Sequence, residues 1–446
     1  MSSEWRTQKI SSLGEFDRGK SKHRPRDAAH LYGGPYPFIQ TGDITNSGGR
    51  VTSFRQTYSE AGLAQSRLWP AGTLAITIAA NIAETALLTF PACFPDSVVG
   101  FTADPGKADV RFIEYLFQAM RKQVKSHAYG SAQENINLEV LRNLEFPIPP
   151  LNIQAAIADY LSLLDDRITL LRETNATLEA IAQALFKSWF VDFDPVRAKM
   201  EGRAPESMDE ATAALFPDAL VESELGRVPK GWRMSHLADL TSTHHGSIQT
   251  GPFGSQLHAS DYVDSGVPVV MPKDIKDRRV MTDSVARVSQ ENADRLSRHQ
   301  LIAGDIVFSR RGDVERHALI TQREAGWLCG TGCLLLRPGK SWRSSTFLSM
   351  ALDAAQARTW LVQHAVGATM PNINTGILGS VPVLLPPDAL LSAFEDVVSA
   401  TELQRSHNSS TAETLSTLRD TLLPRLISGQ LRLPEALAEM SVEAAR

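Results

Sequence analysis

Apolar residues after Pro150 recur at alternating intervals of four and three positions. The series runs through Ile157, Leu161, Leu164, Ile168, Leu171, Asn175, Leu178, Ala182, Leu185 and Trp189. This spacing, kept over about five heptads, is typical of a coiled-coil seam. It predicts one helix over residues 151–190, which would be about 60 Å long at 1.5 Å per residue. Asn175 is the polar member of the series, and a polar residue at such a position commonly fixes helix register.

A second and weaker helical pattern covers residues 388–430. We expect this helix to pair antiparallel with the first, although two separate amphipathic helices on separate cores remain an alternative. A polar stretch at 407–410 interrupts the pattern, so pairing should be least secure there. Its apolar positions are Phe394, Val397, Val398, Leu403, Leu415, Leu418, Leu422 and Leu426.

Short apolar runs separated by Gly, Pro, Asn and Ser precede each helix, which is the pattern of β-strands and turns. The clearest runs lie at 36–39, 73–78, 267–271 and 305–309. One further helix is predicted in each half of the chain, over 109–125 and 345–362. The expected fold class is therefore α+β, with mostly β modules and two long helices.

The chain contains an internal repeat. Residues 130–137, which end in Asn-Ile-Asn, recur as residues 367–374, at an offset of 237. Upstream, residues 37–44 match 268–275, and residues 71–74 and 86–88 match 303–306 and 318–320. A colinear series of matches indicates duplication of one module plus one helix, and hence a pseudo-twofold protein.

The repeat divides the chain into six segments. We expect a first module at 1–150, a first long helix at 151–190 and an exposed acidic linker with one short helix at 191–230. A second module should then occupy 231–387, a second long helix 388–430 and a tail 431–446. If the helices pair, the two modules would lie about 35–40 Å apart, which is close to one turn of B-DNA.

Charge is distributed unevenly along the 446 residues. The net charge is −5, yet residues 1–150 carry +2 and residues 231–387 carry +3, so the helices, linker and tail are acidic. Only three cysteines, no signal peptide and no apolar run long enough to cross a membrane favour a cytoplasmic protein. We expect Cys329 and Cys333 to be buried small side chains and not half of a metal site.

Catalytic motifs are missing from the sequence. Both Pro-Pro pairs follow an apolar residue and not the Asp or Asn of an amino-methyltransferase, and Gly339-Lys340-Ser341 lacks the glycine spacing of a phosphate-binding loop. His244-His245 has no companion at metal-ligand spacing. We therefore expect no catalytic residue, metal or cofactor in this chain.

Basic residues gather on loops of both modules, where they could neutralise phosphates and contact base edges. For any single residue, a solvated loop is an equally good interpretation. The first module offers Arg18, Lys20, Lys22, His23, Arg24 and Arg26. The second offers Lys273, Lys276, Arg278, Arg279, Arg310, Arg311 and Arg316, together with Gln249, Ser255 and Gln256 in a glycine-rich stretch expected to be a loop.

The chain resembles the specificity subunit of Type I restriction–modification systems over essentially its whole length. The resemblance is carried by Gly130 to Gln154, by Leu185 to Pro195, by Glu224 to Trp232 and by Leu418 to Gly429. It implies two target-recognition domains that each read half of a split double-stranded DNA sequence. It also implies helices that dock two methyltransferase subunits, to which two motor-nuclease subunits add. Adenine methylation with S-adenosylmethionine would then belong to the partner.

Two other functions stay open from the residues alone. The first is an assembly protein that presents two protein-binding modules and no DNA surface, and the remoter one is an enzyme whose site the motif search does not detect. The predicted seam would also serve subunit docking, and Phe186, Trp189, Phe190 and Phe193 are expected to be an exposed apolar face.

Overall fold

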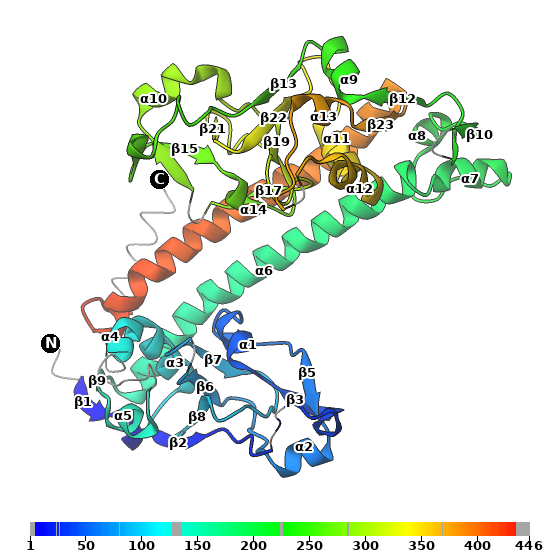
Figure 1. Ribbon diagram of the computed structural model, residues 1–446. Coiled ribbons are helices and arrows are strands. Elements are labelled where there is room, and N and C mark those ends of the chain that lie inside the picture. The colour runs from blue at the N-terminus through cyan, green and yellow to red at the C-terminus, as the bar shows by residue number, and fades with distance from the viewer. Residues whose placement is uncertain are drawn as a thin grey trace. The chain divides into compact units, whose positions relative to one another are not determined.

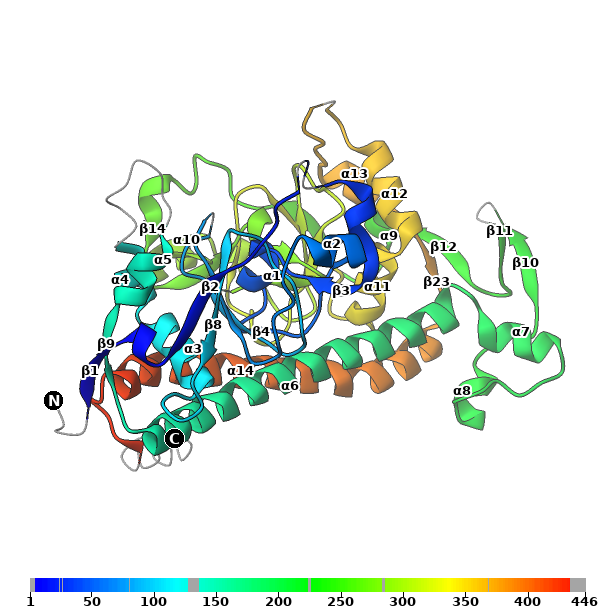
Figure 2. The same ribbon diagram turned by 90° about the horizontal axis from the view of Figure 1, so that it is seen from below.

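The computed structural model describes residues 5–23, 25, 27–79, 81–126, 136–223, 226–282, 285–367 and 369–433. The chain forms two compact units (Figures 1 and 2). Unit 1 contains residues 1–171 and 411–446, and unit 2 contains residues 172–410. Across the described ranges, no helix has both the length and the apolar character needed to cross a membrane.

Unit 1 is built on a five-stranded sheet in the order β2 (Gly14–Arg18), β8 (Val98–Ala103), β6 (Leu74–Thr77), β7 (Thr85–Leu88) and β4 (Arg50–Val51). All neighbours are antiparallel except β4, which runs parallel to β7. Two smaller pairs are β3 (Tyr32–Phe38) with β5 (Gln56–Tyr58), and β1 (Arg6–Lys9) with β9 (Glu145–Ile148). The helices are α1 (Thr41–Thr45), α2 (Glu60–Ala64), α3 (Val110–Ala119), α4 (Arg121–Ser126) and α5 (Leu138–Asn143).

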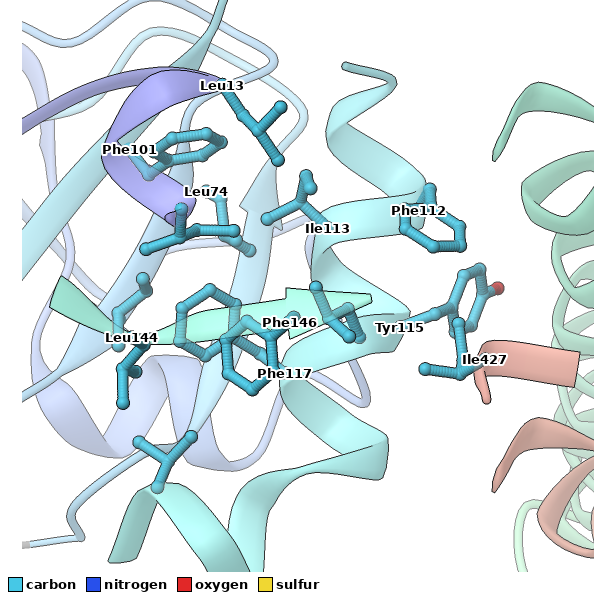
Figure 3. Close-up of a cluster of buried hydrophobic side chains, with 14 of the residues drawn as sticks. Leu13, Leu74, Phe101, Phe112, Ile113, Tyr115, Phe117, Leu144, Phe146 and Ile427 are labelled. Carbon is cyan, nitrogen blue, oxygen red and sulfur yellow. The ribbon is translucent and has the colours of Figure 1, made fainter. Parts of the chain in front are cut away.

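The core of unit 1 lies between this sheet and α3. Figure 3 shows Leu74 and Phe101 of the sheet near Ile113 and Phe117 of α3. Phe112, Ile113, Leu116 and Phe117 have no exposed surface, because one whole face of α3 packs against apolar strand residues. Burying each such side chain stabilises the fold by about 1.5–3 kcal/mol relative to leaving it in water.

Unit 2 has two four-stranded sheets. The first has the order β13 (Ser247–Thr250), β22 (Cys333–Arg337), β19 (Ile306–Ser309) and β20 (His317–Leu319), all antiparallel. The second has the order β14 (Tyr262–Val263), β18 (Ala286–Val288), β15 (Val267–Val270) and β21 (Leu328–Cys329). Smaller pairs are β12 (Arg233–His236) with β23 (Pro382–Leu385), β16 (Ile275–Lys276) with β17 (Arg279–Val280), and β10 (Leu220–Ser223) with β11 (Gly226–Pro229).

The described residues of unit 2 also form seven short α-helices. They are α7 (Asp194–Met200), α8 (Glu210–Ala214), α9 (Leu237–Thr243), α10 (Gln290–Arg295), α11 (Ser345–Asp353), α12 (Ala355–His364) and α13 (Thr375–Gly379). Residues 109–125 and 345–362, each predicted as one helix, form two helices each. Ala354 has extended backbone (φ −59°, ψ 142°), which ends α11 and starts α12. Met120 (φ −96°, ψ 10°), which is not extended, separates α3 from α4.

The two long helices are α6 (Leu151–Phe190) and α14 (Asp388–Ile427). In unit 1, Ile168 and Leu171 of α6 pack against Ala412 and Leu415 of α14. In unit 2, Trp189 near the end of α6 packs against Phe394 near the start of α14, with ring centroids 5.9 Å apart. The helices therefore run antiparallel in both units, which confirms the predicted pairing and the α+β fold class.

The predicted seam of α6 is largely buried. Ile157, Leu161, Leu164, Ile168, Leu171, Ala182 and Trp189 are buried, and Asn175, Leu178 and Leu185 are half-buried. On α14 the prediction is wrong for Val397 and Leu403, which are 52% and 74% exposed. The weaker periodicity of α14 did not distinguish its packed face from its exposed one.

Asn175 finds its partners in the polar stretch of α14. Its amide donates to the Oγ of Ser409 (3.0 Å) and to the carbonyl of Arg405 (3.1 Å). The amide of Asn408, which is 4% exposed, donates to the Oδ1 of Asn175 (2.9 Å). The polar stretch at 407–410, which made pairing near that end less certain from the sequence, supplies the polar contacts that the seam asparagine requires.

The sequence repeat forms matching contacts in each unit. The backbone N–H of Ile136 donates to the carbonyl of Ile78 (3.1 Å), and that of Ile373 donates to the carbonyl of Arg310 (3.0 Å). Likewise, the carboxylates of Asp43 and Asp274 each accept a 2.9 Å bond from the backbone three residues earlier. The repeat is therefore structural as well as sequential.

The stretch from 191 to 230 is more ordered than expected. It holds the two helices α7 and α8 and the β10–β11 hairpin, and its Val196 and Phe216 are buried in the core of unit 2. Pro195 lies in the first turn of α7, where its missing N–H has no intrahelical partner to lose.

The aromatic residues at the end of α6 are buried, which corrects the expected exposed apolar face. Phe186, Trp189, Phe190 and Phe193 are each at most 8% exposed. Their rings contact partners brought in by tertiary folding, such as Phe190 with Phe394 (5.0 Å between centroids) and Phe193 with Trp232 (5.5 Å). The heptad pattern could not show these partners because they are distant in sequence.

Replacement of Asn175 by alanine should destabilise unit 2. The substitution leaves the buried amide of Asn408 without its acceptor, and such an orphaned group costs about 1–3 kcal/mol. Urea denaturation followed by circular dichroism measures the loss. The double variant Asn175→Leu/Asn408→Leu removes both polar groups and should recover much of the stability. A double variant as unstable as Asn175→Ala would show that the pair is not the cause.

Candidate nucleic-acid interface

The buried titratable groups serve packing. Burial raises the pKa of Glu114 to about 8, and its carboxyl bonds to Gln118 and Thr85. Burial lowers the pKa of His317 to about 4, so this ring is neutral and contacts Ser349. Cys329 and Cys333 are buried as predicted. In the part of the chain that the structure describes, His, Cys, Asp and Glu form no group of three able to hold a metal ion.

Exposed cations of unit 1 lie at the end of β2 and on the loop that follows it. Arg18, Lys20 and Lys22 are exposed, whereas Ser21 between the lysines is 6% exposed. The loop is held in place, because the Oγ of Ser66 donates to the carbonyl of Lys20 (2.8 Å). The structure thus presents these cations on a fixed backbone, which lowers the entropic cost of binding.

His23 continues this loop but is half-buried. Its backbone N–H donates to Gln65 (2.9 Å), and its ring contacts the carbonyl of Pro25 (3.1 Å) and the ring of His30. Arg24 and Arg26 lie outside the described residues.

The glycine-rich stretch of unit 2 is not a continuous loop. Gln249 lies on β13, and its amide donates to the carbonyl of Arg298 (2.6 Å). The carbonyl of the Gln256 side chain accepts from the backbone of Phe253 (3.1 Å). Only Ser255 of the three predicted residues is exposed. The sequence pattern missed the strand because its polar residues resemble those of a turn.

The β16–β17 hairpin divides its four predicted cations. Lys273 and Lys276 are exposed, whereas the Arg278 side chain is 8% exposed and pairs with Glu179 of α6. Arg279 pairs with Glu402 of α14 (3.4 Å). These two arginines therefore hold the hairpin against the helices of unit 2.

Glu179 is shared by two guanidinium groups. Arg278 and Arg405 both contact its carboxylate, and Arg405, only 5% exposed, also pairs with Glu402 (2.5 Å). Although burial opposes ionisation, the two guanidinium groups keep the pKa of Glu179 below its usual range. These ion pairs form only through tertiary folding, because Arg278 and Arg405 lie about 100 and 226 residues from Glu179 in the sequence.

The loop after β19 carries the last three predicted cations. Arg311 is exposed, Arg310 is half-buried, and Arg316 is exposed and paired with Asp313. Backbone bonds fix Arg310, whose N–H donates to the carbonyl of Gly332 (2.9 Å) and whose carbonyl accepts from Ile373 (3.0 Å). Arg311 and Arg316 are therefore exposed on a loop that is hydrogen-bonded to the segments around Gly332 and Ile373.

Sequence reasoning missed a concave surface beside the basic loop of unit 1. A cavity of about 490 Å³ is lined by Ser21 and Asp27 of that loop and by Gln40, Thr41 and Gln56. The only sequence signal was Gln40, which falls at the end of a predicted strand, inside the repeated segment 37–44.

Comparisons with known proteins agree with these features. Residues 2–180 match the family model described as the Type I restriction modification DNA specificity domain. The Type I restriction enzyme HindI specificity subunit of Haemophilus influenzae is 29% identical over 335 residues, which are 66% of this chain and 71% of that protein. The MjaIX specificity subunit of Methanocaldococcus jannaschii is 23% identical over 441 residues, or 97% of this chain and 94% of that one.

A solved structure shows the same fold. The Type I restriction–modification S subunit from M. genitalium superposes with a TM-score of 0.59 at 16% identity, covering 95% of this chain and 96% of that one. Residues 2–180 thus match a specificity domain, and the chain is similar over almost its whole length to specificity subunits of Type I restriction enzymes.

Proposed function

We propose that this chain is the non-catalytic DNA-reading subunit of a cytoplasmic Type I restriction–modification complex. Each module would read one half of a split double-stranded sequence, and the helices would hold two methyltransferase subunits, joined by two motor-nuclease subunits. S-adenosylmethionine and the chemistry of adenine methylation would belong to the methyltransferase. The observation that carries the proposal is the duplicated module, which presents exposed cations on anchored loops in both units.

Recognition of DNA would use two kinds of contact, to phosphates and to base edges. Lys20, Lys22, Lys276 and Arg311 are exposed cations suited to phosphates, which supply affinity but no sequence information. Discrimination between sequences requires side chains that reach base edges.

Docking of the methyltransferase would use a face of α6 other than the seam. The predicted seam residues Ile157, Leu161 and Ile168 are buried within unit 1 and have no surface to offer. Leu163 and Leu170, seven residues apart on α6, are 66% and 51% exposed. Large apolar side chains on one exposed helix face are typical of a protein-binding surface.

Methylation mapping of the host genome with and without this gene tests the proposed function. We expect N6-methyladenine to disappear from one split motif, made of two short half-sites around a fixed gap, when the gene is removed. An unchanged methylome would favour the assembly protein without a DNA surface. In that case the affinity of the assembled complex for random duplex DNA should also lack the steep salt dependence of a phosphate-binding protein.

Arg311→Ala and Arg278→Ala should have different effects. Loss of an exposed phosphate contact at Arg311 should weaken DNA binding for all sequences and reduce the slope of log K against log salt by about one. Loss of Arg278 should instead lower the stability of unit 2 by about 1.5–3 kcal/mol, since it removes one of the two guanidinium groups that bond to Glu179 and leaves Arg405 in place. Fluorescence anisotropy across a salt series and urea denaturation measure the two effects. An Arg278 variant that is stable but binds DNA with a lower slope would contradict this assignment.

Leu163→Glu should weaken binding of the methyltransferase subunit without unfolding the chain. The side chain is exposed, so the charge costs little in the isolated protein, but it would be desolvated in an apolar interface. Co-purification and thermal denaturation provide the two readouts. The matched change Glu173→Leu, at an exposed position of the same helix, should leave binding intact. Normal assembly of Leu163→Glu would exclude this face as the docking surface.

A further inference from the structure

The cavity beside the basic loop of unit 1 has walls from several parts of the module. Tyr32 and Phe38 come from β3, Gln56 begins β5, and Gln40 immediately precedes α1. In Figure 1, β3, β5 and α1 lie together in the blue part of the chain. The volume of about 490 Å³ is sufficient for the edge of a nucleobase.

The aromatic wall of the cavity is fixed by packing. The ring of Phe38 stacks on that of Tyr58 with 4.1 Å between centroids, and the ring of Tyr32 lies 5.2 Å from the same tyrosine. Tyr58 is fully buried. The cavity is therefore preformed in the free protein, and a ligand would not have to pay for ordering its walls.

Two glutamine side chains at the cavity form a hydrogen-bonded pair. The Nε2 of Gln40 donates to the Oε1 of Gln56 (2.6 Å), and both residues are exposed. Among the described residues, the Gln56 side chain makes this one hydrogen bond. Both hydrogens of its NH2 group and one lone pair of its oxygen therefore remain available.

The charges near the cavity favour a polyanion. Ser21 in the wall is flanked by the exposed Lys20 and Lys22, and Gln56 is preceded by the exposed Arg55, whose Nε lies 3.9 Å from the carboxylate of Asp43. Among the described lining residues, Asp27 is the carboxylate. A second cavity of unit 1, of about 540 Å³, has Glu139 and Glu145 in its lining, where the Nζ of Lys9 donates to Asn143 (3.2 Å).

We propose that Gln56, oriented by Gln40, reads an adenine in the half-site that unit 1 recognises. This assignment rests on the proposed function and names the specificity-determining side chain within it. A glutamine amide donates to N7 of adenine and accepts from its N6 amino group in the major groove, and the Gln56 oxygen keeps a second lone pair for that contact beside its bond to Gln40. Gln40 is a positioning residue, because it acts through Gln56. In unit 2, Met271 occupies the position that matches Gln40. The pair of Gln40 and Gln56 is therefore confined to one module and one half-site.

Methylation mapping with the assembled methyltransferase complex tests the assignment. Gln56→Glu replaces the donor by a second acceptor, and a carboxylate accepts from the N4 amino group of cytosine. We expect methylation at the native motif to fall about ten- to a hundredfold. Preference at one position of one half-site should change from adenine towards cytosine, and the other half-site should stay the same.

Three further variants keep the result interpretable. Gln56→Ala should relax discrimination at that same position, and it provides the answer if the glutamate variant fails to fold in a thermal denaturation assay. Gln40→Met, which introduces the residue of unit 2, should reduce discrimination at that position only, because the backbone bond to Asp43 does not need the side chain. Gln123→Glu makes the same chemical change at the acidic cavity and should leave the motif unchanged.

The outcomes separate the two proposals. If Gln56→Glu and Gln56→Ala methylate the native split motif with unchanged efficiency and preference, the reading role of Gln56 is wrong and the proposed function stands. If the wild-type complex methylates no split motif, the proposed function itself fails. A uniform loss of methylation at both half-sites, without a change in preference, would show that Gln56 only supports the fold or general affinity.

Discussion

Antiparallel packing of α6 against α14 is the constraint on which the rest of the structure depends. Each compact unit contains one half of each helix, so neither module has a complete core without a segment from the other end of the chain. In unit 1, Leu422 and Leu426 of α14 join the core that the first module builds with Ile157 of α6. In unit 2, Phe186 and Phe190 of α6 join the core of the second module.

Polar contacts add specificity to this apolar pairing. Hydrophobic seams tolerate sliding by a turn, whereas the bonds of Asn175 to Asn408 and Ser409 are satisfied in one register only. Ion pairs play a similar part at the surface of the helices. Arg419 of α14 contacts Asp165 of α6 in unit 1, and Arg405 of α14 contacts Glu179 of α6 in unit 2.

The two modules share the same fold but differ in the loops that would contact a ligand. The loop after β19 contains Arg310 and Arg311, whereas the matching loop after β6 begins with Ile78 and Ala79. Conversely, Gln40 of unit 1 stands where unit 2 has Met271. A duplicated frame with divergent loops suits a protein whose two halves read different sequences, because loops change without cost to the core.

The sequence by itself determined the repeat, the α+β class, the long helices and their antiparallel pairing. These features follow from local periodicity and from colinear matches, and both patterns can be read directly from the sequence. Tertiary structure decided which polar residues are available. Arg278 and Arg279 look like surface cations in the sequence, yet the carboxylates of Glu179 and Glu402 draw them against the helices. Gln40 and Gln56 gave almost no signal, because a shared cavity arises only when β3 and β5 pair. Burial and ion pairing depend on partners distant in the chain, and no local pattern encodes where those partners will lie.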